Sequence, residues 1–263
     1  MVKLHHGHPM EVHQLKEHKK KSWITYLFEF FMLFLAVFCG FLAEYQLEHT
    51  IERDREKEFI VSMVKEMQID MIDIKRTEND TVRYKYLDTL ALNIFIGDRS
   101  QKTMKKIYEI YFNYGTYYHS YVYEEFTLGQ LKYAGNMRLI RNKKVADRLI
   151  YLDGLLSNLH QQEMDYRDYM IDNTKLGSKI MDRSYFVKDG KFIPYNEALK
   201  NARILCFLTN DRQALMEFGN NIKAQSSILK MYHKKLDAVR IYTDSSIMIL
   251  KKEYHLKNKE LKK

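Results

Sequence analysis

Histidines near the start of the sequence are the first side chains that could do chemistry. Half of the ten histidines lie in the first eighteen residues: His5, His6, His8, His13 and His18. Imidazoles bind transition metals and titrate near neutral pH, so this segment could bind a metal or sense protons. The spacing is irregular and no cysteine lies nearby, which is more typical of a disordered tail. We therefore expect no metal site and no cofactor.

A basic cluster is the second candidate. Four cations follow Gly135 within a few residues: Arg138, Arg141, Lys143 and Lys144. Such a cluster can contact a phosphate or a lipid headgroup. The alternative is a solvated surface whose charge neutralises Asp147 and its neighbours.

Tyrosines form the third candidate. Seven of them occur within sixteen residues: Tyr108, Tyr111, Tyr114, Tyr117, Tyr118, Tyr121 and Tyr123. Their rings could form a wall on which a ligand stacks. We expect instead an aromatic stripe in the core, with amphipathic edges whose hydroxyl groups reach water.

Motifs of the common enzyme classes are missing from the sequence. It contains no phosphate-binding loop, dinucleotide fingerprint, zinc-protease helix, nucleophile elbow or paired-cysteine motif. Its two cysteines, Cys39 and Cys206, cannot form a disulfide framework or a four-thiolate zinc site. Because Cys206 lies between Leu205 and Phe207, we expect its thiol to be buried and unreactive. We do not expect an enzyme.

One apolar segment is long enough to cross a membrane. Trp23 to Ala43 comprises 21 residues with one ionisable group, Glu29. A helix of that length spans about 30 Å, the thickness of the hydrocarbon core of a bilayer. The segment exceeds the roughly 7–15 apolar residues of a signal peptide, and no small-residue cleavage site follows it. We predict an uncleaved, single-pass transmembrane helix.

Charges on the two sides of this segment predict its orientation. Residues 1–22 contain five lysines and two acids, whereas residues 44–58 contain three basic residues and six acids. By the positive-inside rule, residues 1–22 form a cytoplasmic tail, residues 23–43 span the inner membrane, and residues 44–263 form a periplasmic domain. The net charge of +9 is spread over both signs. We expect no nucleic-acid partner.

Glu29 is the least ordinary residue of the predicted span, because an acid within a bilayer is costly unless it is neutralised or paired. It could be protonated or reach the headgroups, form a hydrogen bond to another helix, or relay protons. Ala36, Gly40 and Ala43 follow at helical spacing and would share its face. Small residues let membrane helices approach closely. We expect these four residues to mediate association within the bilayer.

The rest of the sequence predicts an all-α fold. Two prolines and ten glycines are too few for a turn-rich β-fold. Apolar spacing predicts a stalk helix that continues the span as far as Ile96, followed by helices at about 102–125, 128–135, 143–179, 196–208 and 212–256. We expect one β-hairpin at about 185–193, turning at Asp189-Gly190. Residues after Lys251 should form a frayed tail.

Polar residues mark the ends of several predicted helices. Thr127 and Gln130 have the spacing of a capping box, in which each side chain satisfies a free backbone amide. Gly135-Asn136 can end that helix, because both residues tolerate left-handed dihedral angles. Asn142 can cap the next helix.

Two segments resemble a known family. They are YLFEFFMLFLAVFCGFLAEYQLEHTIERDREKEFI and TLGQLKYAGNMRLIRNKKVADRLIYLDGLL. Together they resemble uncharacterised single-pass inner-membrane proteins of Bacteroidota, which have one N-terminal span and a helical extracytoplasmic domain. The resemblance implies an acid in the span, here Glu29, a charged exit at Glu44 to Arg53, and a turn at Gly135 to Ile140. The resemblance implies the helical fold and the location in the inner membrane, but it implies no activity.

These observations favour a non-enzymatic, membrane-anchored scaffold or accessory subunit of an inner-membrane complex. Its partners would be membrane lipid and either a second copy of the chain or another inner-membrane protein. The alternative is a sensory bundle that binds a ligand beside the tyrosine-rich helix and signals through the membrane helix. An unrecognised hydrolase or transferase is the third class.

Overall fold

The computed structural model describes residues 22–78, 82–117, 120–121, 126–201, 204–257 and 259–261. These residues form the predicted all-α fold, with one two-stranded antiparallel hairpin. The helices are α1 (Trp23–Glu78), α2 (Arg83–Ile96), α3 (Gln101–Ile110), α4 (Phe126–Tyr133), α5 (Lys143–Ile180), α6 (Tyr195–Asn201) and α7 (Arg212–Glu253). The five N-terminal histidines lie outside the described residues.

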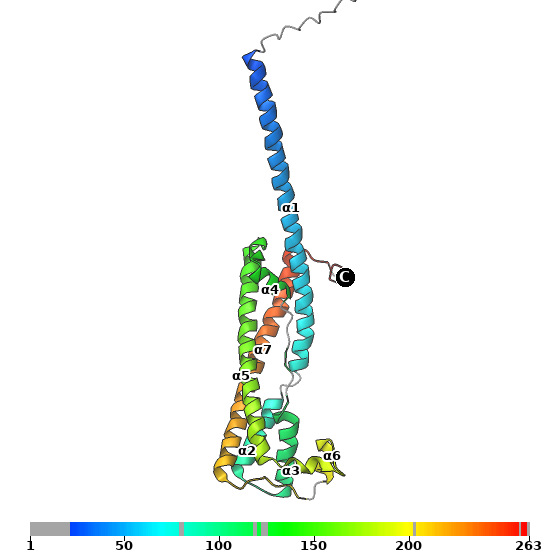
Figure 1. Cartoon of the computed structure of the whole chain (residues 1–263), viewed down its shortest axis with the longest axis vertical. Coiled ribbons are helices and arrows are strands. Elements are labelled where there is room, and N and C mark those ends of the chain that lie inside the picture. The colour runs from blue at the N-terminus through cyan, green and yellow to red at the C-terminus, as the bar shows by residue number, and fades with distance from the viewer. Residues whose placement is uncertain are drawn as a thin grey trace, which may run out of the picture. The chain divides into compact units, whose positions relative to one another are not determined.

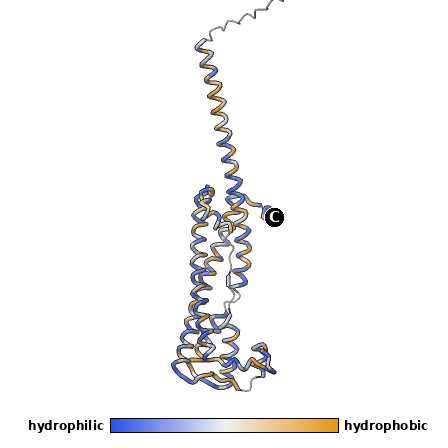
Figure 2. Tube along the Cα trace, viewed as in Figure 1, coloured by the Kyte–Doolittle hydropathy of each residue, from blue (hydrophilic) through white to orange (hydrophobic). Residues whose placement is uncertain are grey.

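The chain divides into two compact units, Met1–Glu52 and Arg53–Lys263. In the first unit, the described residues from Trp23 onward belong to α1, and residues 22–48 are all exposed. Figure 2 shows that apolar residues are concentrated along this part of the helix. Among the described residues, α1 is the one helix long and apolar enough to cross a membrane.

The second unit is built on α5 and α7, which pack along each other (Figure 1). Both helices carry apolar residues at three- and four-residue spacing, so each presents a continuous buried stripe. The predicted helix at about 143–179 is confirmed, and its apolar residues Val145, Leu149, Leu152, Leu156 and Leu159 are buried. Residues of α1 and α2 complete the same core cluster: Ile60, Met63, Val64, Met67, Ile74, Leu87, Leu90 and Ile94.

The expected helical run from Glu44 to Ile96 is interrupted. α1 ends at Glu78 and α2 begins at Arg83, so the prediction of an unbroken run was wrong. Val82 precedes α2 in a turn, and Asn79-Asp80-Thr81 before it lie outside the described residues. Side chains of these types form hydrogen bonds with nearby backbone groups and compete with helix formation.

The tyrosine-rich helix is shorter than predicted. α3 ends at Ile110 and passes into one π-helical turn, η1 (Tyr111–Gly115), rather than continuing to Glu125. The Arg83 guanidinium, 7% exposed, donates hydrogen bonds to the carbonyls of Asn113 and Tyr114, both at 3.3 Å, and of Tyr117. Carbonyls at a helix end lack partners within the helix, so this buried cation stabilises the early termination.

The segment after α6 is extended instead of helical. Phe207 forms a β-bridge with Met181, and the predicted helix to Leu208 was therefore wrong. Side chains alternate between opposite faces of an extended chain, so Leu205 and Phe207 are buried while Cys206 between them is exposed. The expectation of a buried thiol was wrong for the same reason.

The predicted hairpin is confirmed, with strands of two residues each, β1 (Val187–Lys188) and β2 (Lys191–Phe192). A 3₁₀ turn, η3 (Arg183–Phe186), precedes β1. Asp189 and Gly190 have φ angles of 52° and 74°, as a two-residue hairpin turn requires.

Candidate functional site

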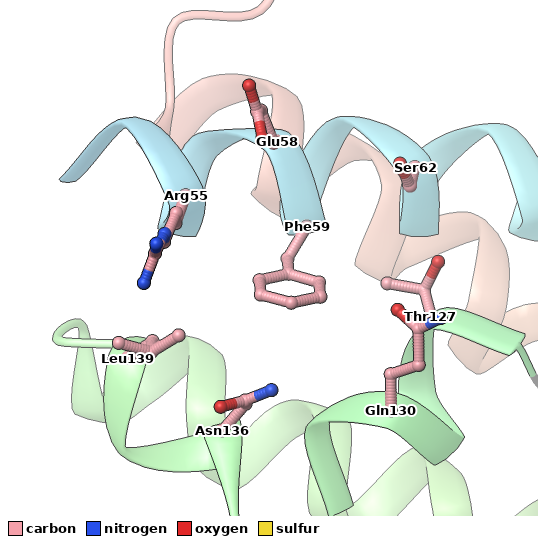
Figure 3. A pocket seen from close by; sticks show the side chains of 8 residues that line it. All are labelled: Arg55, Glu58, Phe59, Ser62, Thr127, Gln130, Asn136 and Leu139. Carbon is pink, nitrogen blue, oxygen red and sulfur yellow. The ribbon is translucent and has the colours of Figure 1, made fainter. Parts of the chain in front are cut away.

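A cleft with a volume of about 380 Å³ lies between α1 and the segment that contains α4 and the 3₁₀ turn η2 (Asn136–Leu139) (Figure 3). We call it the α1–α4 cleft. Its lining residues are Arg55, Glu58, Phe59, Ser62, Thr127, Gln130, Asn136 and Leu139. Figure 3 shows the Phe59 ring projecting from α1 towards the opposite wall, with Asn136 and Gln130 facing it.

One end of the cleft is fixed by Glu66 of α1. Its carboxylate accepts the backbone N–H of Thr127 at 3.1 Å and the Thr127 hydroxyl at 2.5 Å. The predicted capping box between Thr127 and Gln130 is therefore replaced by a carboxylate from another helix. A negative charge at a helix N-terminus is favourable, because the first backbone amides have no partner within the helix.

The other end is fixed by Glu56 of α1, which is 6% exposed. Its carboxylate accepts the backbone N–H of Arg141 at 2.9 Å and the Tyr254 hydroxyl at 2.5 Å. Burial, reinforced by the hydrogen bond to Glu56, raises the pKa of Tyr254. The hydroxyl therefore keeps its proton, and its hydrogen bond to Glu56, to a higher pH than an exposed tyrosine does.

The chain that follows α7 is held in the same region. Tyr254 bonds to Glu56, and the Lys57 ammonium lies 2.7 Å from the Glu260 carboxylate. Leu256 and Leu261 pack against the core. The expectation of a frayed tail after Lys251 was therefore wrong for the described residues, since these side chains find partners on α1.

Local sequence signals shape the wall opposite α1. Gly135 has a φ of 68°, the left-handed conformation predicted for the end of α4. Asn142 caps α5 as predicted, because its side-chain oxygen accepts the N–H groups of Lys144 at 3.1 Å and Val145 at 3.4 Å. These two turns set the direction of the chain on either side of η2.

Three of the polar side chains that line the cleft supply hydrogen-bond donors and have no partner among the described residues. They are the Arg55 guanidinium and the side-chain amides of Gln130 and Asn136. A guanidinium and two amides supply hydrogen-bond donors, and the Phe59 ring supplies an apolar surface. The arrangement can therefore bind a ligand that combines polar and apolar parts.

Comparison with known proteins does not identify the cleft. No family model, curated protein or solved structure matches this chain. The resemblance to the Bacteroidota family therefore stays a prediction.

The four residues predicted to associate within the bilayer lie in the first part of α1. Because the segment is helical throughout, Glu29, Ala36, Gly40 and Ala43 fall within about 60° of one another around the helix axis. All four are exposed, and no other atom lies within 4 Å of the place where a Cβ on Gly40 would be. The association of this face within a bilayer stays a prediction.

The predicted basic cluster is exposed and does not line the α1–α4 cleft. Arg138 lies on η2, Arg141 follows it, and Lys143 and Lys144 begin α5. Lys144 lines a separate, open depression between α5 and α7. Contact of these cations with an anion stays a prediction.

The predicted aromatic core stripe is confirmed at Tyr108 and Tyr111, which are both fully buried. The Tyr108 hydroxyl donates to the Cys206 carbonyl at 2.7 Å and accepts the Asp182 N–H at 2.8 Å. Tyr117 is exposed, and Tyr118 and Tyr123 lie outside the described residues. Within the described range, Tyr108 and Tyr111 at the start of the run therefore serve packing.

Sequence reasoning missed Glu56, Glu66 and the cleft between them. One signal was present, because Glu56 lies four residues before Ile60 and therefore on the apolar stripe of α1. An acid on a buried stripe needs a hydrogen-bond donor from elsewhere in the fold. The spacing of residues along α1 could not predict which residue would be that donor.

Proposed function

We propose that this chain is a non-enzymatic, membrane-anchored helical scaffold or accessory subunit of an inner-membrane complex. Residues 23–43 would span the membrane once, with the N-terminus in the cytoplasm and residues 44–263 in the periplasm. Either a second copy of the chain or another inner-membrane protein would bind the face formed by Glu29, Ala36, Gly40 and Ala43.

The observation that carries this proposal is the complete exposure of residues 23–48 on α1. A helix whose side chains include Phe30, Phe34 and Phe38, all exposed, is unfavourable in water. Lipid or a partner helix would cover these rings. The acid and the small residues share one face, where lipid is a poorer neighbour than a helix that can accept a hydrogen bond and approach closely.

Native purification of the full chain in mild detergent, followed by identification of co-purifying proteins, tests the proposal. Gly40→Leu and Glu29→Leu should weaken the complex, because the first separates the helices and the second removes the hydrogen-bonding group. Glu29→Gln should retain most of it, because an amide still bonds across helices. Phe38→Leu, on the opposite face of α1, is the matched control.

An unchanged oligomeric state and an unchanged set of partners in both Gly40→Leu and Glu29→Leu would show that the span is only an anchor. Equal weakening by Phe38→Leu would show that the effect does not belong to the proposed face. Circular dichroism of each variant checks that the helices of Arg53–Lys263 remain folded.

The second candidate is a sensory bundle that binds a ligand and signals through α1. The α1–α4 cleft favours this alternative, since one of its walls belongs to α1 itself. The site differs from the one that the sequence suggested, which was the tyrosine-rich helix.

A further inference from the structure

We propose that the α1–α4 cleft binds an amphiphilic anion, which is a phosphate or carboxylate group carried on a small apolar body. The inference goes beyond the proposed scaffold and depends only on residues of Arg53–Lys263. It rests on the charge, the apolar surface and the fixed walls of the cleft.

Arg55 supplies the charge. Its guanidinium has no ion-pair or hydrogen-bond partner in the described part of the chain, and Figure 3 shows it directed towards Leu139 on the opposite wall. A guanidinium binds carboxylate and phosphate through two parallel hydrogen bonds. The side-chain amides of Gln130 and Asn136 add donors on the opposite wall.

The one acid that lines the cleft, Glu58, does not neutralise this site. Figure 3 shows Glu58 directed away from α4, and the same residue lines the neighbouring depression with Lys57 and Glu260. On the other wall, Arg138 of η2 adds positive charge near the cleft. The Glu56 and Glu66 carboxylates at the two ends of the cleft are occupied as acceptors of hydrogen bonds from Arg141, Tyr254 and Thr127. The charged group directed into the cleft is therefore the Arg55 guanidinium, which favours an anion.

Phe59 and Leu139 supply the apolar surface. Both are half-buried, so each ring or methyl group still has a face that a ligand can cover. The Phe59 ring lies between the polar groups of the two walls (Figure 3). A ligand that places its anion at Arg55 would therefore bring its apolar body onto this ring.

The walls are held in place before any ligand arrives. Glu56 and Glu66 are ten residues apart on α1, about 15 Å along the helix, and each bonds to one end of the opposite wall. Arg55, Phe59 and Ser62 lie in or beside this interval. A preorganised site loses less conformational entropy on binding. The volume of about 380 Å³ lies within the range of roughly 300–1,000 Å³ of small-molecule pockets.

Calorimetric titration of the full chain, held in phosphatidylcholine nanodiscs, tests the inference with three probes. Phenyl phosphate carries both parts of the proposed ligand, inorganic phosphate has only the anion, and benzyl alcohol has only the ring. We expect saturable binding of phenyl phosphate at one site, with each of the other probes at least about tenfold weaker.

Arg55→Gln should weaken the binding of phenyl phosphate about tenfold, because it removes a charge-assisted pair of hydrogen bonds. Arg53→Gln is the matched control, since Arg53 is exposed on the same helix, loses the same charge and does not line the cleft. It should leave the affinity unchanged within about twofold. Gln130→Ala should weaken binding by a smaller factor.

Three results would overturn the inference. They are the absence of saturable binding by phenyl phosphate, equal losses in Arg55→Gln and Arg53→Gln, and binding of inorganic phosphate as tight as that of phenyl phosphate. Both arginines are exposed, so loss of folding does not confound the comparison.

The source of the natural anion is tested by repeating the titration in nanodiscs that contain phosphatidylglycerol. Competition by the lipid headgroup would lower the apparent affinity for phenyl phosphate in the unmodified chain and leave the residual binding of Arg55→Gln unaffected. An unchanged affinity would identify a soluble amphiphile as the ligand. Either result is compatible with the proposed chemistry and decides between its two sources.

Discussion

The Glu66 carboxylate on α1 accepts two hydrogen bonds from Thr127, one from its backbone N–H and one from its hydroxyl. These residues lie 61 positions apart in the sequence. Thr127 is 4% exposed, so water cannot replace the carboxylate without rearrangement. The pair therefore fixes α4 against α1 and defines one end of the α1–α4 cleft.

Glu66→Ala should destabilise the protein by about 1–2 kcal/mol, because it leaves buried donors of Thr127 without an acceptor. Thermal unfolding of the full chain, followed by circular dichroism, measures the change. Glu58→Ala is the control, since Glu58 is exposed on the same helix and no ion pair or hydrogen bond of its side chain occurs in the described structure. Equal stability of the two variants would argue against the role assigned to Glu66.

Gly177→Ala should destabilise the protein by about 1–3 kcal/mol through overpacking. A Cβ at position 177 would overlap the hydroxyl and ring of Tyr111, which is fully buried and cannot move aside easily. Gly154→Ala in the same helix is the control, because no atom lies within 4 Å of its Cβ position. It should raise stability by about 0.5–1 kcal/mol, the helix preference of alanine over glycine.

These two glycine variants are compared by their midpoints of thermal unfolding. Both changes add the same methyl group to α5. Shifts of the same sign would therefore contradict the overpacking that we assign to Gly177→Ala.

Stability should fall as the pH rises above about 10, the ordinary pKa of tyrosine. Burial raises the pKa of Tyr108 far above that value, so the folded state keeps a proton that the unfolded state releases. The free energy of unfolding then decreases with pH, because the unfolded state binds fewer protons. The contribution of the protonated Tyr108 hydroxyl to stability is fully present below about pH 10 and is lost progressively above it.

Tyr108→Phe should reduce this alkaline slope, and should lower stability at neutral pH by about 1–2 kcal/mol because the Asp182 N–H and the Cys206 carbonyl lose their partner. Tyr133→Phe, at a residue that is 77% exposed, is the control. Unfolding in denaturant at several pH values measures both effects. An identical slope in Tyr108→Phe and in the unmodified chain would refute the explanation.

An alkaline phosphatase fused after Lys263 should be active, because the enzyme folds only in the periplasm and the lysines at 19–21 favour a cytoplasmic N-terminus. A reporter that works only in the cytoplasm, fused at the same position, should be inactive. The opposite pair of results would reverse the proposed orientation of the chain.

Local sequence patterns determined most of the helices of Arg53–Lys263. The apolar stripes of α5 and α7, the cap at Asn142 and the turn at Asp189-Gly190 were all readable, because each depends on residues within a few positions of one another. The 21-residue apolar segment could be predicted from the sequence for the same reason.

Packing between distant segments determined several helix ends and the α1–α4 cleft. Glu66 takes the place of the predicted capping box, and Arg83 ends η1 from another helix. Glu56 finds a donor in Tyr254, 198 residues away. The cleft exists because two carboxylates on α1 hold α4 and η2 at its two ends. Hydrogen bonds between such distant residues depend on how the helices pack, and a pattern of period 3.6 along one helix carries no information about its neighbour.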